Sequence, residues 1–316
     1  MSAFTEARMH LGVELCGAGR HPAALRRGGV DPAALVDPAW WTRLVRDAAA
    51  RGLDLVVLPD GPAGVLDAVA MAGRIAPLVP GIGLVPQVDV TGTDPALPAK
   101  AIATLDVVST GWEPVTSTNW RESASVVEGV LEPDDGVRRL AHSRPLTVVR
   151  ADEPDALAVA AGHADVVRVA APGLDAAHAV RERVRDAAAR AGRHADDLTV
   201  LLDVEVHLAA DARASLRRLD RAGELAPSTL RVVGAAVDLA NLVERTVALG
   251  AADGITFLPL ALPTDLHAIT REVVPLLVRG EHVDAEPAAR ADPRPRRGRP
   301  RRAEADQRRV ERERGE

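Results

Sequence analysis

The stretch Leu53-Asp-Leu-Val-Val-Leu-Pro59, followed by Asp60-Gly-Pro62, decides the fold. A short apolar run that ends in Gly and Pro is typical of a strand rather than of a helix. Its apolar residues follow one another without in/out alternation, which is the pattern of a strand in a sheet covered by helices. We therefore expect a parallel sheet with helices packed on its outer face.

Similar apolar runs recur along the chain as far as residue 280. Amphipathic helical patterns lie between them, the clearest at residues 41–49, 97–108 and 266–277. Repeated strand and helix units of this kind predict an α/β fold, a (β/α)8 TIM barrel that forms a single domain over residues 1–280. The predicted strands cover residues 11–15, 53–59, 82–88, 112–116, 146–149, 165–169, 198–208 and 255–260.

An open, doubly wound sheet is the main alternative to the barrel. That fold would place a Gly-x-Gly-x-x-Gly motif directly after the first strand. The first predicted strand is followed instead by Cys16-Gly-Ala-Gly-Arg-His-Pro22, whose His-Pro step cannot start a helix directly. The barrel is therefore the favoured fold.

The composition of the chain excludes several classes of protein. The chain is 47% apolar and 27% charged, with a formal charge of -6, which indicates a globular protein. A single cysteine and unpaired histidines predict neither a disulfide framework nor a metal site. Because no apolar run approaches the roughly 20 residues that span a bilayer, and no signal peptide precedes the first strand, we expect a cytoplasmic protein without membrane contact.

Residues 281–316 differ in composition from the rest of the chain. Pro, Arg and Glu replace the β-branched residues there, which predicts a disordered tail. Its Arg294-Pro-Arg-Arg-Gly-Arg-Pro-Arg-Arg302 segment could contact phosphates, but 9 carboxylates accompany the tail's 11 arginines, so a solvated tail is the favoured interpretation. With aromatic residues at only 2% of the chain, a nucleic-acid partner is not expected.

In a (β/α) barrel the site lies at the carboxyl ends of the strands, where the loops converge. Asp60 ends one strand and would either cap the next helix or present its carboxylate to a ligand. Thr116-Ser-Thr-Asn119 would serve as helix caps or as hydrogen-bonding groups for a planar ligand. Asp203, Glu205 and His207 alternate along one strand, so their side chains should project to one side, toward a site or toward a solvent-filled edge.

Several segments, taken together and in order, carry one family pattern. They are Leu11-Gly-Val-Glu-Leu-Cys-Gly-Ala-Gly-Arg-His-Pro22, Ile82-Gly-Leu-Val-Pro-Gln-Val88, Lys100-Ala-Ile-Ala-Thr-Leu-Asp-Val-Val-Ser109, Gly111-Trp-Glu-Pro-Val-Thr-Ser117 and Ala252-Asp-Gly-Ile-Thr-Phe257. This pattern resembles the bacterial luciferase-like flavin-dependent monooxygenases, in particular the branch of the nitrilotriacetate and sulfone monooxygenases. The resemblance implies a (β/α)8 barrel that uses reduced FMN and dioxygen.

The resemblance also implies which residues hold the cofactor. Asp60 matches a family carboxylate near the flavin, Pro86, Gln87 and Val88 match the strand end against the ring, and Thr116 and Ser117 match polar contacts to the ring edge. After the fifth strand, where relatives hold the FMN phosphate, this chain has Arg150-Ala-Asp-Glu153. Asp152 and Glu153 repel a phosphate dianion, and Arg150 offsets only one of those charges.

The expected function is therefore a monooxygenase that acts on a small organic substrate, with a separate flavin reductase as a partner and a homodimer as the assembly. Two alternatives stay open. In the first alternative, the barrel has lost efficient flavin chemistry and acts as a binding or partner subunit. In the second, it uses the deazaflavin coenzyme for hydride transfer. No catalytic residue follows from the sequence, because such a flavin does the oxygen chemistry itself.

Overall fold

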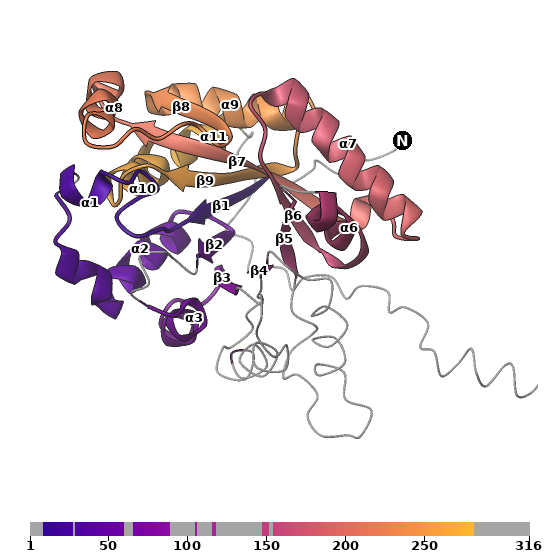
Figure 1. Ribbon diagram of the computed structural model, residues 1–316, viewed down its shortest axis with the longest axis horizontal. Coiled ribbons are helices and arrows are strands. Elements are labelled where there is room, and N and C mark those ends of the chain that lie inside the picture. The colour runs from indigo at the N-terminus through magenta and orange to yellow at the C-terminus, as the bar shows by residue number, and fades with distance from the viewer. Residues whose placement is uncertain are drawn as a thin grey trace, which may run out of the picture. The chain divides into compact units, whose positions relative to one another are not determined.

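The computed structural model describes residues 9–27, 29–59, 66–88, 105, 116–117, 147–151 and 154–280 (Figure 1). The strands are β1 (His10–Glu14), β2 (Leu55–Leu58), β3 (Gly83–Val88), β4 (Thr116–Ser117), β5 (Val148–Arg150), β6 (Val166–Val169), β7 (Thr199–Leu208), β8 (Leu230–Gly234) and β9 (Gly254–Pro259). The α-helices are α1 (Ala24–Arg27), α2 (Pro38–Ala50), α3 (Ala68–Ile75), α6 (Pro154–His163), α7 (Leu174–Arg190), α8 (Ala212–Asp220), α9 (Ala236–Ala248), α10 (Thr264–Ala268) and α11 (Val274–Gly280). Short 3-10 segments cover Pro32–Val36, Ala76–Leu78 and Ala195–Asp197, and a π-helical segment, Ile269–Val273, joins α10 to α11.

The strands close into a ring in which neighbouring strands run parallel. Strands β1 to β6 follow one another, β6 pairs with β7, β7 pairs with β9, and β9 returns to β1. Helices follow most of the strands and pack outside them (Figure 1). The predicted (β/α)8 barrel is confirmed, and the open sheet is excluded because the ring has no break between β6 and β1.

Strand β8 is a ninth strand that the sequence pattern did not predict. It pairs with the carboxyl half of β7, from Val204↔Leu230 to Leu208↔Gly234, whereas β6 pairs with the amino half of β7. The sequence Leu230-Arg-Val-Val-Gly234 is short, and each of its residues is only partly buried, so its hydrophobic signal is weak. It extends the sheet at the end of the barrel where the site is expected.

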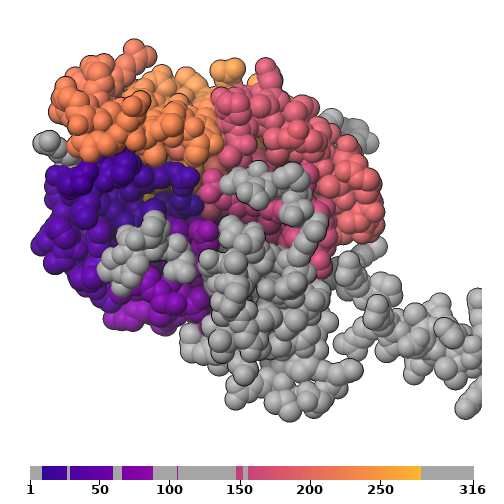
Figure 2. Space-filling view, in the orientation of Figure 1, coloured from indigo at the N-terminus to yellow at the C-terminus, as the bar shows by residue number. Residues whose placement is uncertain are grey.

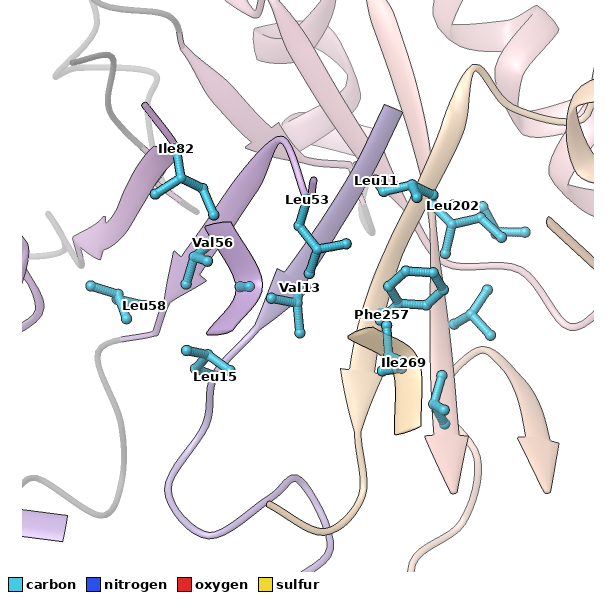
Figure 3. Close-up of a cluster of buried hydrophobic side chains, with 14 of the residues drawn as sticks. Leu11, Val13, Leu15, Leu53, Val56, Leu58, Ile82, Leu202, Phe257 and Ile269 are labelled. Atoms are coloured by element: carbon cyan, nitrogen blue, oxygen red, sulfur yellow. The ribbon is translucent and has the colours of Figure 1, made fainter. Parts of the chain in front are cut away.

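Two apolar layers hold the barrel together. The outer layer joins the strands to the helices, and Figure 3 shows part of it, with Val13 of β1 and Phe257 of β9 on the same side of the sheet. The inner layer fills the amino-terminal part of the barrel with Val57, Val85, Val148, Val166 and Leu201. At about 25 cal/mol per Å² of buried apolar surface, these aliphatic side chains supply most of the stabilisation in a chain with so few aromatic residues.

Three aspartates in the segments that lead into strands close the amino-terminal edge of the barrel. Asp54 accepts a hydrogen bond from the Leu11 N–H at 2.9 Å, Asp165 from the Thr147 N–H at 2.8 Å, and Asp253 from the Val200 N–H at 2.8 Å. Each carboxylate satisfies a backbone N–H near the start of a neighbouring strand. These contacts fix where the neighbouring strands begin.

Some predictions fall on parts of the chain outside the described residues. Of the strand predicted at residues 112–116, only Thr116 lies in the described part, and β4 includes it. The tail from residue 281 to residue 316 also lies outside, so its disorder and the domain boundary stay predictions. No helix within the described segments is long and apolar enough to cross a bilayer.

Candidate functional site

A continuous series of buried and half-buried charges lies inside the carboxyl half of the barrel. We call it the ion chain, because cations and anions alternate along it and each contacts the next. Its members come from β1, the loop after β1, β5, β6, β7 and β8, and both of its ends are arginines. In order they are Arg231, Glu205, Arg20, Glu14, Arg168, Asp203 and Arg150.

Arg168 is the centre of the deeper half of the ion chain. It donates from Nε and Nη2 to the two carboxylate oxygens of Asp203, both at 2.9 Å, and from Nη2 to Glu14 Oε2 at 2.8 Å. The Nε atom of Arg150 lies 3.3 Å from Asp203 Oδ2. Because Arg168, Asp203 and Glu14 are all buried, these bonds compensate charges that would otherwise be costly to remove from water.

Glu205 is the centre of the half that lies nearer the mouth. Arg231 donates from Nε to Glu205 Oε2 at 2.6 Å, and Ser228 donates to Oε1 from its backbone N–H at 3.2 Å and from its hydroxyl at 2.9 Å. Arg20 joins the two halves, because it donates to Glu14 Oε1 at 3.0 Å and its Nε lies 3.6 Å from Glu205 Oε1. Strand β8 is what brings Arg231 to this position, directly across from Glu205.

The charges perturb one another in identifiable directions. Burial raises the pKa of Glu14, but the positive charges of Arg168, Arg20 and Arg150 outweigh burial and hold that pKa below its usual range. Burial raises the pKa of Asp203, and there it outweighs the same kind of attraction. Burial lowers the pKa of Arg168, but Asp203 and Glu14 more than reverse this, so the guanidinium stays charged.

His207 and Asp265 form a second polar contact at the end of β7. The Nδ1 atom of His207 lies 3.3 Å from Asp265 Oδ2, and that oxygen also accepts the Ala261 N–H at 2.7 Å. Asp265 Oδ1 accepts the Leu208 N–H at 3.0 Å, so both of its oxygens are occupied by donors. Together with Asp203 and Glu205, His207 places polar groups at three alternate positions of β7.

The family follows from the sequence itself. The sequence model of the luciferase-like monooxygenases matches residues 115–313, more than half of the chain. The chain belongs to the luciferase-like monooxygenase family. No curated protein matches this luciferase-like chain.

Solved structures agree with the barrel of this luciferase-like chain. EDTA monooxygenase from Chelativorans sp. BNC1 is similar with a TM-score of 0.72 at 17% identity, over 87% of this chain and 94% of that one. DmoA from Hyphomicrobium sulfonivorans is similar with a TM-score of 0.73 at 16% identity, over 88% and 90%. The coenzyme F420 dependent tetrahydromethanopterin reductase from Methanopyrus kandleri is similar with a TM-score of 0.65 at 14% identity, over 86% and 100%. At these identities the likeness concerns the fold.

The structure describes some of the residues that the resemblance assigns to the cofactor. Gln87 and Val88 at the end of β3 pair with Thr116 and Ser117 of β4, so the two predicted ring contacts lie on neighbouring strands. Pro86 is buried in β3. Asp60 lies outside the described residues, as do Asp152 and Glu153.

Arg150 lies at the end of β5, as predicted, and its guanidinium contacts Asp203 inside the barrel. The structure thus brings Arg150 together with the residues of the ion chain. The prediction that Asp203, Glu205 and His207 share one side of β7 is consistent with their contacts, since the first two enter the ion chain and the third contacts Asp265. These three side chains face the barrel mouth rather than a solvent-filled edge, because all are buried.

Sequence reasoning missed the arginines that complete the site. Arg168 interrupts the apolar run Val166-Val-Arg-Val169, and Arg231 interrupts Leu230-Arg-Val-Val-Gly234. A lone arginine within a buried strand requires a buried acid, so this interruption is a usable signal. Throughout the described segments, no group of three or more His, Cys, Asp or Glu side chains could hold a metal ion.

Proposed function

We propose that this chain is an oxidoreductase that binds a flavin-type cofactor at the carboxyl mouth of the barrel and acts there on a small organic substrate. Family membership supports an oxidoreductase, and the similar structures include an EDTA monooxygenase and an F420 dependent reductase. In barrels of this kind the loops after the strands form the site. Reduced FMN with dioxygen is the favoured cofactor pair, and the deazaflavin coenzyme F420 is the alternative.

The described residues fit the electron-rich edge of a reduced flavin ring. Arg20 and Arg150 each have a side chain that is 22% exposed, against 11% for Arg231 and 2% for Arg168, so they are the cations of the ion chain most accessible to a ligand. A reduced ring carries negative charge that such cations stabilise. The polar ends of β3 and β4, with Gln87, Thr116 and Ser117, lie on adjacent strands of the same mouth.

When bound, a reduced flavin supplies two electrons to dioxygen, whereas reduced F420 supplies them to the substrate directly. The residues of this chain bind, orient and shield. Arg20 and Arg150 would orient the ring through its charged edge, while Val57, Val85 and Leu201 close the barrel floor against water. The ion chain keeps Arg20 in place because Glu14 and Glu205 both contact it.

The assembly expected around this activity is also part of the proposal. A monooxygenase that uses reduced FMN needs a source of reduced flavin, so a separate flavin reductase is the expected partner. The family resemblance favours a homodimer, and the predicted cytoplasmic location fits a diffusible reduced flavin. The substrate is a small molecule admitted at the barrel mouth.

Titration of the purified full-length protein tests the cofactor. Oxidised FMN, reduced FMN under anaerobic conditions, and F420 are each titrated by fluorescence and calorimetry. We expect reduced FMN to bind at least tenfold more tightly than oxidised FMN, because Arg20 and Arg150 face the added negative charge. Arg20→Gln should weaken reduced FMN more than oxidised FMN, whereas the exposed Arg43→Gln on α2 serves as the matched control.

A second candidate function is a barrel that has lost efficient flavin chemistry and serves as a binding or partner subunit. One observation favours it: Arg150, the arginine in the segment where the family resemblance places the phosphate, contacts Asp203 at 3.3 Å. Saturable binding of any of the three cofactors supports the oxidoreductase. Failure of all three to bind supports the second candidate.

A further inference from the structure

Two buried polar atoms near the end of β7 take no part in the contacts described above. Within the described part of the chain, His207 Nε2 and Arg231 Nη2 are both buried and have no hydrogen-bond partner. The side chain of His207 is only 4% exposed, and that of Arg231 is 11% exposed. Leaving a buried polar atom unpaired costs about 1–3 kcal/mol, so two such atoms on adjacent strands call for an explanation.

The two side chains lie on the same face of the sheet. Glu205 pairs in register with Arg231, and His207 pairs with Val233, so His207 and Arg231 are diagonal neighbours across β7 and β8. The direct contact between Arg231 Nε and Glu205 Oε2 shows that both side chains point to the same face of the sheet. With a rise of about 3.3 Å per residue and about 4.8 Å between strands, their Cα atoms lie roughly 8 Å apart.

The unpaired atom of His207 is an acceptor. The carboxylate of Asp265 already accepts two backbone N–H groups, so it requires a donor from His207, which assigns the ring proton to Nδ1. Nε2 then carries a lone pair and accepts a hydrogen bond. Asp265 therefore fixes both the tautomer and the orientation of the ring.

The unpaired atom of Arg231 is a charged donor. Its Nε is taken by Glu205 and its Nη1 by the Leu225 carbonyl at 2.9 Å, which leaves Nη2 available. A guanidinium N–H forms its strongest hydrogen bonds with anionic oxygen. A small molecule that combines an O–H donor with an anionic oxygen would satisfy both atoms.

The segment after β1 contacts the end of α8 and the segment between α8 and β8. His21, after β1, contacts Asp220 of α8 at 3.1 Å, and Arg26 donates to the Ala222 carbonyl at 3.0 Å. Arg20 also donates to the hydroxyl of Ser228 at 3.3 Å. In Figure 2 the indigo surface of the first helices lies directly against the orange surface of the α8 region, in agreement with the contact between α1 and α8. These contacts hold the segment after β1 against the end of α8 and the segment between α8 and β8.

We propose that His207 and Arg231 form a binding site for a small hydroxycarboxylate, whose hydroxyl donates to His207 Nε2 and whose carboxylate accepts from Arg231 Nη2. The site does not depend on the proposed flavin chemistry, because it binds its ligand without a cofactor. Its failure and the failure of the flavin titrations are therefore distinguishable.

The test uses three probes that differ by one group each. Glycolate has both the hydroxyl and the carboxylate, acetate lacks the hydroxyl, and glycolamide lacks the charge. Each is titrated into the full-length protein by calorimetry, and the melting temperature is followed as a function of probe concentration. We expect glycolate to bind at least tenfold more tightly than either analogue.

Two conservative variants assign the contacts. His207→Asn keeps an N–H close to the place of Nδ1 for Asp265 and removes Nε2, so it should reduce the preference for glycolate over acetate to less than twofold. Arg231→Lys keeps a positive charge beside Glu205 and removes Nη2, so it should weaken glycolate at least tenfold. His178→Gln, at an exposed histidine on α7, is the control and should leave all three affinities unchanged.

If either variant fails to fold, the wild-type protein still decides the matter. The nitrogen resonance of His207 Nε2 should shift on addition of glycolate and not on addition of acetate. Absence of saturable glycolate binding, or equal binding of all three probes, would overturn the proposal. Equal binding of glycolate and glycolamide would overturn the assignment of an anionic ligand.

Discussion

Arg168 on β6 donates two parallel hydrogen bonds to Asp203 on β7, from Nε to Oδ1 and from Nη2 to Oδ2, both 2.9 Å long. The pair lies inside the barrel, with Arg168 at 1% exposure. Desolvating two ions costs several kcal/mol each, and a planar guanidinium opposite a planar carboxylate is the geometry that best offsets that cost. The contact joins neighbouring strands, and through Glu14 it also reaches β1.

Removing the cation of this pair should be strongly destabilising. Arg168→Met leaves Asp203 and Glu14 buried without their shared guanidinium, so we expect the unfolding free energy to fall by about 3–5 kcal/mol. Urea unfolding followed by circular dichroism measures the change. Arg183→Met removes an exposed arginine of α7 and should change stability by no more than about 0.5 kcal/mol. Equal losses in the two variants would contradict a special role of the buried pair.

The lowered pKa of Glu14 predicts a loss of stability in acid. The ordinary pKa of a glutamate is 4.5, and in the folded chain the pKa of Glu14 lies below it, so the unfolded state takes up the proton first. The stabilisation by Glu14 is therefore complete above the ordinary pKa of 4.5, and it is lost as the pH falls through the lower pKa of the folded state. Glu14→Gln should show a shallower fall in stability on acidification.

The raised pKa of Asp203 has the opposite effect on how stability changes with pH. Burial raises its pKa, so its folded form binds a proton more readily than its unfolded form, and its contribution to stability decreases as the pH rises through the interval between the two values. Because the charge of Glu14 also raises the pKa of Asp203, the difference between Glu14→Gln and wild type reports the coupled titration of the two carboxylates. Urea midpoints measured from neutral pH down to about pH 3 give the two slopes. Parallel slopes would show that Glu14 does not titrate differently in the folded state.

The single cysteine reports on the electrostatics near Glu14. Burial and the negative charge of Glu14 both raise the pKa of Cys16 above its ordinary value of 9.0. Because the thiolate is the reactive form, alkylation by iodoacetamide at about pH 8 should be slower than for a free thiol, with a midpoint of the rate profile above 9.0. The chain unfolded in urea serves as the control. A midpoint at the ordinary value would exclude this environment.

The barrel itself could be predicted because its signal is local. Leu53-Asp-Leu-Val-Val-Leu-Pro59 contains β2, and its nearly continuous apolar run reflects burial on both sides of the strand. The segment at residues 198–208 contains all of β7. Strand β8 could not be predicted in the same way. Its residues are only partly buried, and its position depends on pairing with β7 rather than on its own composition.

The polar site was only half predictable for a related reason. The period of two along a strand is enough to place Asp203, Glu205 and His207 on one side of β7. Their partners are distant in sequence, since Arg168 is 35 residues from Asp203 and Asp265 is 58 residues from His207. Only barrel closure brings these groups together, so the arrangement of the ion chain follows from topology and not from a motif.

The phosphate of FMN provides the last prediction, because the family resemblance and the local charges disagree about it. The resemblance implies that Asp152 and Glu153 stand where relatives hold the phosphate, and Arg150 contacts Asp203. Two carboxylates repel a phosphate dianion, so riboflavin, which has no phosphate, should bind the wild-type protein about as tightly as FMN.

The double variant Asp152→Ser with Glu153→Gly should tighten FMN binding and leave riboflavin unchanged, because two repulsive charges are removed while the backbone N–H groups at the start of α6 remain. The gain should shrink at high salt, since screening weakens interactions between exposed charges. Calorimetric titration of both ligands into both proteins, at low and high ionic strength, measures these differences. If the wild-type protein instead prefers FMN over riboflavin by tenfold, roughly 1.4 kcal/mol, then other residues hold the phosphate and the barrel has kept a complete flavin site.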